Sequence, residues 1–177
     1  MTVIKHKGQR VAVFIDAQNL YHTAKHLYNA KVNFGKIVAD AVAGRVLIRV
    51  IAYAITTESG EETAFLDALT KSGIEVRTKD LQVFAGGAKK ADWDVGLAVD
   101  AITMAPKLDA VIIISGDGDF TPLVEYLQTN EGCQVEAVSF GKSTSGKLKE
   151  AVDEFFDLDT EPKKYLIGAI RRSGTRR

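Results

Sequence analysis

Carboxylates follow two apolar runs of this sequence at the points where the runs end. Asp16 directly follows the run at residues 11–15, and Asp117 and Asp119 come shortly after the run at residues 111–114. A carboxylate that ends an apolar strand is costly unless a partner offsets its charge. Carboxylates that lie close together also repel one another unless a cation lies between them. If the two runs are neighbours in the fold, these acids predict a cation site.

The type of ligand favours Mg²⁺ or Mn²⁺ at this site. These hard ions bind carboxylate and water oxygens, and their remaining positions can hold a phosphate ester. Zinc is disfavoured because no cluster of His or Cys adjoins the acids. His22 and His26 are four residues apart on one predicted helix, but no third ligand lies near them in the sequence, so a surface or packing role is favoured.

A third acidic segment begins a predicted helix. Asp92 is expected to be its N-cap, and Asp94 in the first turn can point at the cation site. Asp100 lies six residues later, about 120° around the helix, and cannot share the same face closely. Asp109 precedes a strand and is therefore expected at the opposite end of the sheet.

Several of these residues also have a purely structural interpretation. Asp119 precedes a helix with Pro122 in its first turn and could be the N-cap of that helix. Asp117 lies between two glycines, as is common in turns. Trp93 could stack on a nucleobase, although an aromatic residue in the first turn of a helix more often packs against the core.

Short β-branched runs alternate along the chain with amphipathic helical patterns. This alternation predicts an α/β fold with a parallel sheet between helices, in which ligands bind beyond the carboxyl ends of the strands. The predicted strands, numbered 1 to 5, are residues 11–15, 46–55, 74–78, 111–114 and 135–140, and the predicted helices are residues 18–29, 34–43, 61–71, 94–104 and 120–130.

Length and composition predict one globular domain. The chain has 177 residues, of which 46% are apolar, and its 23 basic residues balance 23 acidic ones, so any contact with phosphates must come from a local patch. The single cysteine, Cys133, fits a reducing compartment, and we expect a cytoplasmic protein because neither a signal peptide nor a membrane span is apparent. The domain is expected to cover residues 1–160 and to close near Leu158, followed by a basic, partly helical tail at residues 161–177.

Three segments of the chain resemble a known family. They are Phe-Ile-Asp16-Ala-Gln-Asn19-Leu, Asp92-Trp-Asp94-Val-Gly-Leu-Ala-Val-Asp100 and Ser115-Gly-Asp117-Gly-Asp119-Phe, and together with the stretch at residues 148–158 they are similar to the NYN domain family, specifically its LabA-like bacterial branch among the PIN-like nucleases. The chain departs from many members at Asp92-Trp93, where they carry Gly-Val.

The resemblance implies a three-layer α/β/α PIN-like, Rossmann-like domain with a mostly parallel sheet in the order 3-2-1-4-5. It also implies metal-dependent cleavage of RNA phosphodiesters, with Asp16, Asp94, Asp117 and Asp119 as the catalytic, metal-binding acids. Asn19 matches the amide that the family carries just after its first strand.

A metal-dependent ribonuclease is therefore the expected function, and a non-catalytic regulator that binds RNA or protein through the same pocket is the alternative. The expected partner is RNA, most simply single-stranded, and no membrane partner is expected. The sequence leaves open whether the protein forms a homo-oligomer. The residues expected to contact substrate are Asn19, Ser115, Lys89, Lys90, Lys142 and Lys147. For Asn19 and Ser115 a structural role at a helix start or a turn is the open alternative.

Two other phosphate chemistries are disfavoured by single residues. The segment at residues 141–147 has the spacing of a phosphate-binding P-loop, but Leu148 stands where the hydroxyl that holds magnesium belongs. Asp16 could be the nucleophile of an aspartate-based phosphatase, but the second aspartate of that pattern is replaced by Gln18.

Overall fold

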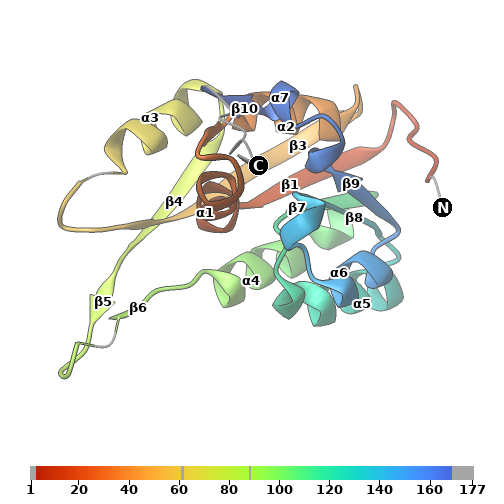
Figure 1. Cartoon of the computed structure of the whole chain (residues 1–177). Helices are drawn as coiled ribbons and strands as arrows, with labels where there is room; N and C mark the ends of the chain where they lie inside the picture. Colours follow the sequence, from red (N-terminus) through yellow and green to blue (C-terminus); the bar gives the residue numbers. More distant parts are fainter. Residues whose placement is uncertain (1–2, 61, 88, 169–177) are drawn as a thin grey trace.

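Six parallel strands form the centre of the molecule (Figure 1). The computed structural model describes residues 3–60, 62–87 and 89–168. Its sheet has the order β4-β3-β1-β7-β8-β9, from β1 (Arg10–Asp16), β3 (Val46–Thr56), β4 (Glu75–Asp80), β7 (Ala110–Ile114), β8 (Gln134–Ser139) and β9 (Glu154–Asp157). The five predicted strands thus follow the predicted order 3-2-1-4-5. β9 adds a sixth strand beside β8 that was not predicted.

Helices cover both faces of the sheet, which confirms the predicted three-layer α/β class. Figure 1 shows α1, α2, α3 and α7 on one face and α4, α5 and α6 on the other. Their bounds are α1 (Ala17–Tyr28), α2 (Phe34–Val42), α3 (Thr63–Lys71), α4 (Asp94–Met104), α5 (Thr121–Asn130), α6 (Gly146–Ala151) and α7 (Pro162–Tyr165). Short 3-10 turns are η1 (Ala105–Lys107), η2 (Gly118–Phe120), η3 (Gly141–Ser143) and η4 (Leu158–Thr160).

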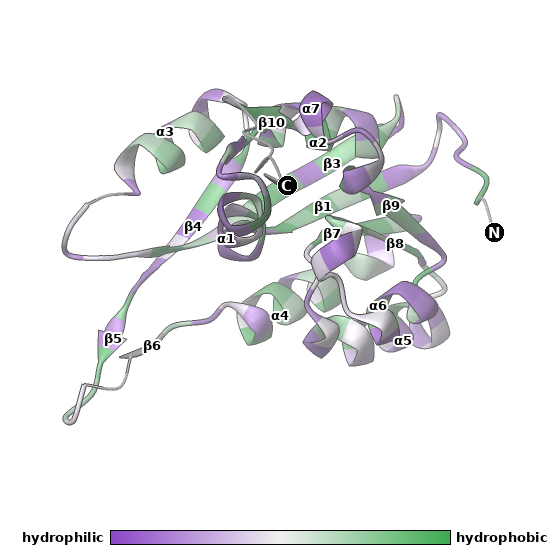
Figure 2. Ribbon diagram, in the orientation of Figure 1, coloured by the Kyte–Doolittle hydropathy of each residue, from purple (hydrophilic) through white to green (hydrophobic). Residues whose placement is uncertain are grey.

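The two central strands are buried on both faces. Every residue of β7 is buried, and residues 11–15 of β1 have no exposed surface. Their alternate side chains enter two separate cores, one beneath α1 and α2 and the other beneath α4 and α5. Figure 2 shows the result as apolar central strands between helices that carry both polar and apolar residues. This double burial explains the near-continuous apolar runs of the sequence, as is usual for a parallel sheet.

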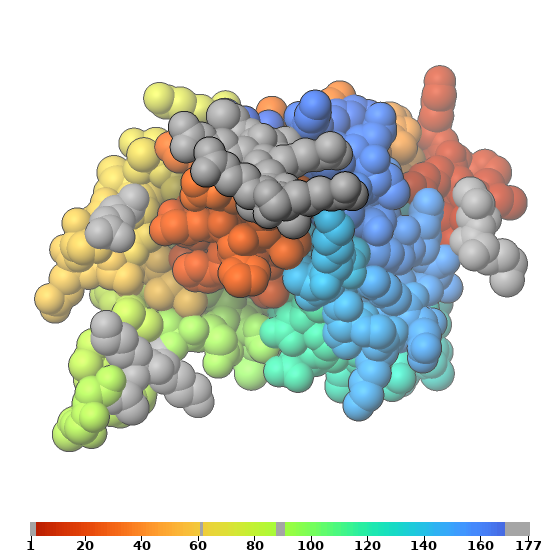
Figure 3. Space-filling view, viewed as in Figure 1, coloured from red at the N-terminus to blue at the C-terminus, as the bar shows by residue number. Residues whose placement is uncertain are grey.

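Two small antiparallel pairs lie outside the main sheet. β5 (Gln82–Val83) pairs with β6 (Lys89–Lys90) at the end of an arm that projects from the body of the molecule (Figure 3). β2 (Lys31–Val32) pairs with β10 (Leu166–Ile167), so the segment after η4 returns to the region between α1 and α2.

The packed part of the chain extends beyond the predicted closing point near Leu158. Tyr165 is 1% exposed in the core under α1 and α2, and its hydroxyl donates a hydrogen bond to Asp40 at 2.8 Å. Leu166 is 9% exposed in the same core. The first residues of the predicted tail therefore belong to the domain, whereas residues 169–177 lie outside the described part.

In the part of the chain that the structure describes, every helix is too short or too polar to cross a membrane.

Candidate metal site

Three carboxylates converge at the carboxyl edge of the sheet. Ile15 of β1 pairs with Ile114 of β7, so the residues that follow these strands lie next to each other. Asp16 comes from the end of β1, Asp117 from the loop after β7, and Asp94 from the start of α4. One oxygen from each lies within 4.8 Å of the others.

Asp16 is held by hydrogen bonds to both of its carboxylate oxygens. Its Oδ1 accepts the backbone N–H of Asn19 at 3.3 Å, so Asp16 is the N-cap of α1. Its Oδ2 accepts the hydroxyl of Ser115 at 3.1 Å. Asp16 therefore ends the strand, begins the helix and presents a fixed carboxylate at the sheet edge.

Ser115 joins two of the acids from a buried position. It has no exposed surface, and besides donating to Asp16 its Oγ accepts the N–H of Asp117 at 3.1 Å. Asp117 in turn accepts the N–H of Asp119 at 2.9 Å, which caps η2. Ser115 was expected to contact substrate, but its burial places it beneath the carboxylates, where it positions them.

Asn19 ties the loop after β7 to α1. Its Oδ1 accepts the N–H of Gly116 at 3.1 Å. A side chain at Gly116 would also come within 3.0 Å of the hydroxyls of Ser139 and Thr144. The absence of a Cβ thus lets the acidic loop lie close to the neighbouring loop.

Trp93 fixes the start of α4 and with it Asp94. Its indole N–H donates to the carbonyl oxygen of Ala54 at 2.9 Å, and its ring lies 5.3 Å from that of Tyr53. A Cβ at Gly96 would approach the indole ring to 2.7 Å, so the ring lies directly over this glycine. Trp93 is therefore a packing residue, as the structural interpretation expected.

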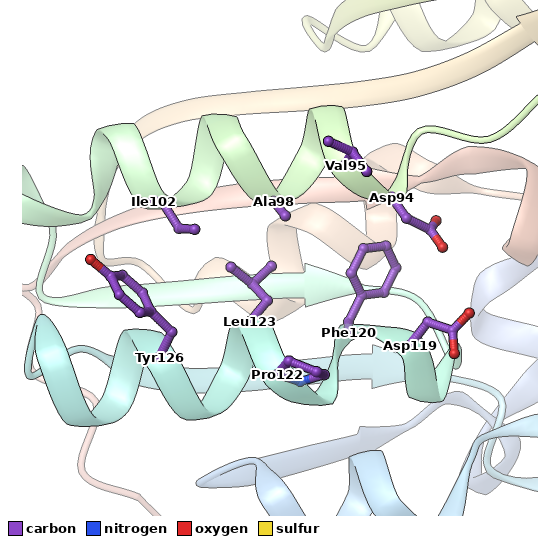
Figure 4. A pocket seen from close by; sticks show the side chains of 9 residues that line it. All are labelled: Asp94, Val95, Ala98, Ile102, Asp119, Phe120, Pro122, Leu123 and Tyr126. Atoms are coloured by element: carbon purple, nitrogen blue, oxygen red, sulfur yellow. The ribbon is translucent and has the colours of Figure 1, made fainter.

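Asp119 lies beside the three converging acids rather than among them. Figure 4 shows its carboxylate and that of Asp94 at the same end of a groove between α4 and α5. The groove has a volume of about 360 Å³ and is lined mainly by apolar side chains. Because Asp119 is exposed and the N-cap of α5 is Phe120, the proposed capping role of Asp119 at that helix is not observed.

The pKa values of Asp16 and Asp94 are both raised in this site. Burial is the largest cause of the raised pKa of Asp16, opposed by the hydrogen bonds from Asn19 and Ser115. For Asp94, burial and then the charges of Asp117 and Asp16 raise the pKa to about 6. The site thus concentrates the negative charge of three half-buried carboxylates.

The donor set and spacing fit a hard divalent cation. Opposite ligands of an octahedral Mg²⁺ with bonds of about 2.1 Å are about 4.2 Å apart, close to the 4.8 Å limit within which the three oxygens lie. Among the described residues, the group of potential ligands found here contains only carboxylates, which argues against zinc.

Other candidate acids and histidines lie elsewhere. Asp100 bonds to the hydroxyl of Tyr53 at 2.7 Å and to Arg77, on the side of α4 that faces β3 and β4. Asp109 accepts hydrogen bonds from Arg10 at the opposite edge of the sheet. His22 and His26 are both exposed on α1 and belong to no group of three potential metal ligands among the described residues.

The predicted phosphate-contacting lysines are dispersed. The backbone of Lys89 and Lys90 forms β6 in the projecting arm, and their side chains lie outside the described part. Lys142 is exposed, with its ammonium 5.6 Å from the centroid of the Tyr28 ring. Lys147 is exposed in the first turn of α6, and that turn lies next to η2 because Ser145 donates its N–H to the carbonyl of Gly116 at 3.0 Å.

The P-loop-like segment has its amides occupied by acids. The N–H groups of Gly141 and Lys142 donate to Asp157 and Asp159, both at 2.8 Å. Because these two amides already donate to carboxylates, they are not free to bind a phosphate, which agrees with the lack of a hydroxyl at Leu148.

The particular hydrogen bonds by which two residues position the site were not predicted. Ser115 precedes the Gly-Asp pair directly, and this adjacency is the signal that could have shown a hydroxyl between two carboxylates. The side chain of Gln18 makes two hydrogen bonds to the backbone of Ile55. Its Nε2 donates to the Ile55 carbonyl at 3.1 Å, and its Oε1 accepts the Ile55 N–H at 3.2 Å. No sequence pattern indicated this bridge between α1 and β3, because it depends on how the strands pair.

Comparison with known proteins identifies relatives of the whole domain. Low amplitude and bright protein LabA from Synechococcus elongatus is 28% identical over 162 residues, which cover 86% of each chain. A crystal structure of a protein of unknown function, VPA0982 from Vibrio parahaemolyticus, is 31% identical with a TM-score of 0.82, and the match covers 93% of this chain and 100% of that one.

The match to a family model covers the converging acids. Residues 10–159 match the model of the NYN domain, a range that includes β1, the start of α4 and the loop after β7. These are the segments on which the resemblance was first seen. The chain therefore belongs to the NYN domain family.

Proposed function

We propose that this protein is a ribonuclease that hydrolyses RNA phosphodiester bonds with the help of Mg²⁺ or Mn²⁺. The observation that carries the proposal is the convergence of Asp16, Asp94 and Asp117 at the carboxyl edge of the sheet. Membership of the NYN family, which generally comprises nucleases, supports a hydrolase. Single-stranded RNA is the proposed substrate.

In this proposal the chain supplies rigid oxygen ligands and no nucleophilic side chain. Asp16, Asp94 and Asp117 would hold the cation, which when bound activates water and offsets charge on the phosphate. Ser115 keeps two of the carboxylates in place, so little reorganisation is needed on binding. Asp119 borders the site from η2, where it can accept a hydrogen bond from water at the edge of the cluster.

Positive charge for the RNA backbone must come from nearby loops, because the chain has no net charge. Lys147 is the best placed of the proposed contacts, since α6 begins against the acidic loop. Asn19 is half-buried beside Asp16 and already uses its carbonyl oxygen on Gly116. Its amide N–H groups are the part of that side chain proposed to contact a phosphate oxygen.

The test is cleavage of labelled single-stranded RNA with Mn²⁺, compared with Asp16→Asn and Asp117→Asn. We expect each variant to lose at least about 100-fold in rate, because each removes a charged ligand. Asp67→Asn, which changes an exposed acid on α3, is the matched control and should cleave like the wild type. Chelator should abolish cleavage. Equal cleavage by the wild type and the two site variants would rule out the proposed site.

The alternative function is a regulator that binds RNA or protein without turnover. It predicts RNA or protein binding that is independent of metal, with no product formed under any of these conditions. The same samples distinguish the two functions, because binding and cleavage are measured on one set of variants.

A further inference from the structure

A cavity of about 970 Å³ lies next to the carboxylate cluster, on the side of α1 and β3. Gln18, two residues after Asp16, and Ala91, three residues before Asp94, both line it. Its lining residues come from α1, the end of β3 and the connection that follows it, α3, and the start of the projecting arm, which are the elements labelled in Figure 1. A chain held at the cluster could therefore place a neighbouring group in this space, which we call the Tyr21 cavity.

The walls of the Tyr21 cavity contain aromatic rings. Tyr21 from α1 and Phe65 from α3 both line it, with their ring centroids 5.2 Å apart and their planes tilted by 52°. The ring of His22 meets that of Tyr21 edge-on at 5.4 Å. Half-buried aromatic rings in an open cavity are surfaces on which a flat, unsaturated ligand can stack.

The polar groups of the cavity favour a base over a phosphate. Glu58 and Glu62 line it, and their negative charge would repel a phosphate, whereas carboxylates accept hydrogen bonds from the amino groups of nucleobases. The hydroxyl of Thr57 donates to Glu62, which lowers the pKa of that carboxyl and keeps it ionised. Lys25, also in the lining, is exposed and can reach a backbone phosphate outside.

The groove between α4 and α5 does not offer the same combination. Its lining has two acids at one end and otherwise apolar side chains, with Tyr126 as a half-exposed aromatic residue at 36% exposure. It contains no basic side chain. Figure 4 shows Tyr126 at the end of the groove away from Asp94 and Asp119, so it serves as an internal comparison for an aromatic side chain outside the Tyr21 cavity.

We propose that the Tyr21 cavity binds an unpaired nucleobase of the RNA whose backbone lies at the carboxylate cluster, with Tyr21 and Phe65 as the stacking surface. This inference rests on the proposed function for the identity of the ligand. The volume is at the upper end of the about 300–1000 Å³ usual for ligand pockets, so it has room for a base with its ribose. A base inside the cavity cannot be paired, so the site selects single strands.

The experiment is fluorescence anisotropy of a labelled ten-nucleotide RNA at low salt with Ca²⁺, so that a hard cation can occupy the carboxylates, and gels confirm that the RNA stays intact. Tyr21→Leu keeps an apolar side chain but removes the ring, and should weaken binding by about tenfold or more. Tyr21→Phe keeps the ring and should bind within about twofold of the wild type. Tyr126→Leu, the matched control in the α4–α5 groove, should bind like the wild type. The same RNA in a duplex should bind at least about tenfold more weakly than the single strand.

Hydrogen exchange of the wild-type protein tests the same cavity without a variant, which matters if Tyr21→Leu does not fold. RNA should protect amides at residues 62–66 and 81–83 and leave those of α5 unchanged. The proposal is overturned by wild-type affinity in folded Tyr21→Leu, by equal binding of the duplex, or by protection confined to α5.

The two proposals fail separately. If cleavage requires Asp16 and Asp117 but RNA binding does not depend on Tyr21, the proposed base-binding role of the cavity is wrong and the ribonuclease proposal stands. Binding that needs Tyr21, without cleavage under any metal, would keep the cavity and leave a regulator that binds single-stranded RNA.

Discussion

Single hydrogen bonds decide how the carboxylates of this protein are presented. The clearest case is Ser115, whose one hydroxyl donates to Asp16 and accepts from the N–H of Asp117. It is fully buried, so water cannot replace it in either bond. A small side chain with no metal-binding role thus sets the separation of two proposed ligands.

Ser115→Ala should destabilise the protein by about 1–3 kcal/mol, because it leaves one acceptor and one donor without a partner. It should also weaken Mn²⁺ binding, since the two carboxylates lose a shared support. Denaturant unfolding and a Mn²⁺ titration measure the two effects. Ser143→Ala, an exposed serine in η3, is the control for losing a hydroxyl. Unchanged stability and affinity in Ser115→Ala would show that the bridge is unimportant.

Asp94 should make the metal-free protein less stable as pH rises. Its pKa is about 6 in the folded state against an ordinary value of 3.8, so the folded protein binds this proton more tightly than the unfolded chain does. The resulting loss is absent below pH 4, develops between pH 4 and 6, and is complete above pH 6. After allowance for solvent screening we expect about 1–2 kcal/mol.

The measurement compares unfolding of the wild type and Asp94→Asn in chelator at pH 5 and pH 7.5. The variant should gain stability relative to the wild type at the higher pH, because it carries no charge to bury. Adding Mn²⁺ should stabilise the wild type more than the variant. A stability difference that does not change with pH would contradict the raised pKa.

At the scale of elements, the start of α4 is set by packing rather than by a side-chain cap. The N-cap residue of α4 is Trp93, and its side chain makes no capping hydrogen bond. Asp92, the expected N-cap, lies one residue earlier and accepts the N–H of Asp94 at 3.3 Å. The indole instead anchors the helix to β3 through Ala54 and lies over Gly96. The spacing of Trp93 and Gly96 thereby directs Asp94 toward the other acids.

Gly96→Ala should therefore destabilise the protein by about 1–3 kcal/mol, although alanine is normally the better helix former. The added Cβ would lie 2.7 Å from the indole ring, which must move and carry the helix start with it. Weaker Mn²⁺ binding should accompany the loss. Gly146→Ala is the matched control, because nothing lies within 4 Å of the added Cβ in α6. Equal stability of both variants would show that the indole adapts without cost.

At the scale of the whole molecule, the segment after η4 covers part of the face of the sheet that carries α1 and α2. Tyr165 packs against Phe156 of β9 with ring centroids 5.9 Å apart and bonds to Asp40 of α2. The β10–β2 pair holds this segment in place. The segment that the sequence suggests is a tail thus contributes to the core that supports α1 and the cluster.

Tyr165→Ala should cost about 3–5 kcal/mol of unfolding free energy, as for other large buried aromatic residues. Tyr165→Phe should cost about 1 kcal/mol, because it loses only the hydrogen bond to Asp40. Thermal and denaturant unfolding provide the values. A loss below 1 kcal/mol for Tyr165→Ala would mean that the segment after η4 is not part of the cooperative domain.

The sequence by itself determined the α/β class, because double burial leaves near-continuous apolar runs. The order of the five main strands was predicted from the resemblance of three segments to the NYN family, and the apolar runs alone left it open. The sequence also placed Asp109 at the opposite edge and separated Asp100 from Asp94, since both follow from strand direction and helix period. Bounds were close for long periodic elements such as α4.

Only the tertiary structure decided which acids meet and what supports them. Asp119 is only two residues after Asp117 yet lies outside the group of three, because η2 turns it toward the groove between α4 and α5. β9, the buried role of Ser115 and the Tyr21 cavity depend on contacts between segments far apart in the chain. Local sequence patterns indicate burial and periodicity, but they do not indicate which residues far apart in the chain come into contact in the folded protein.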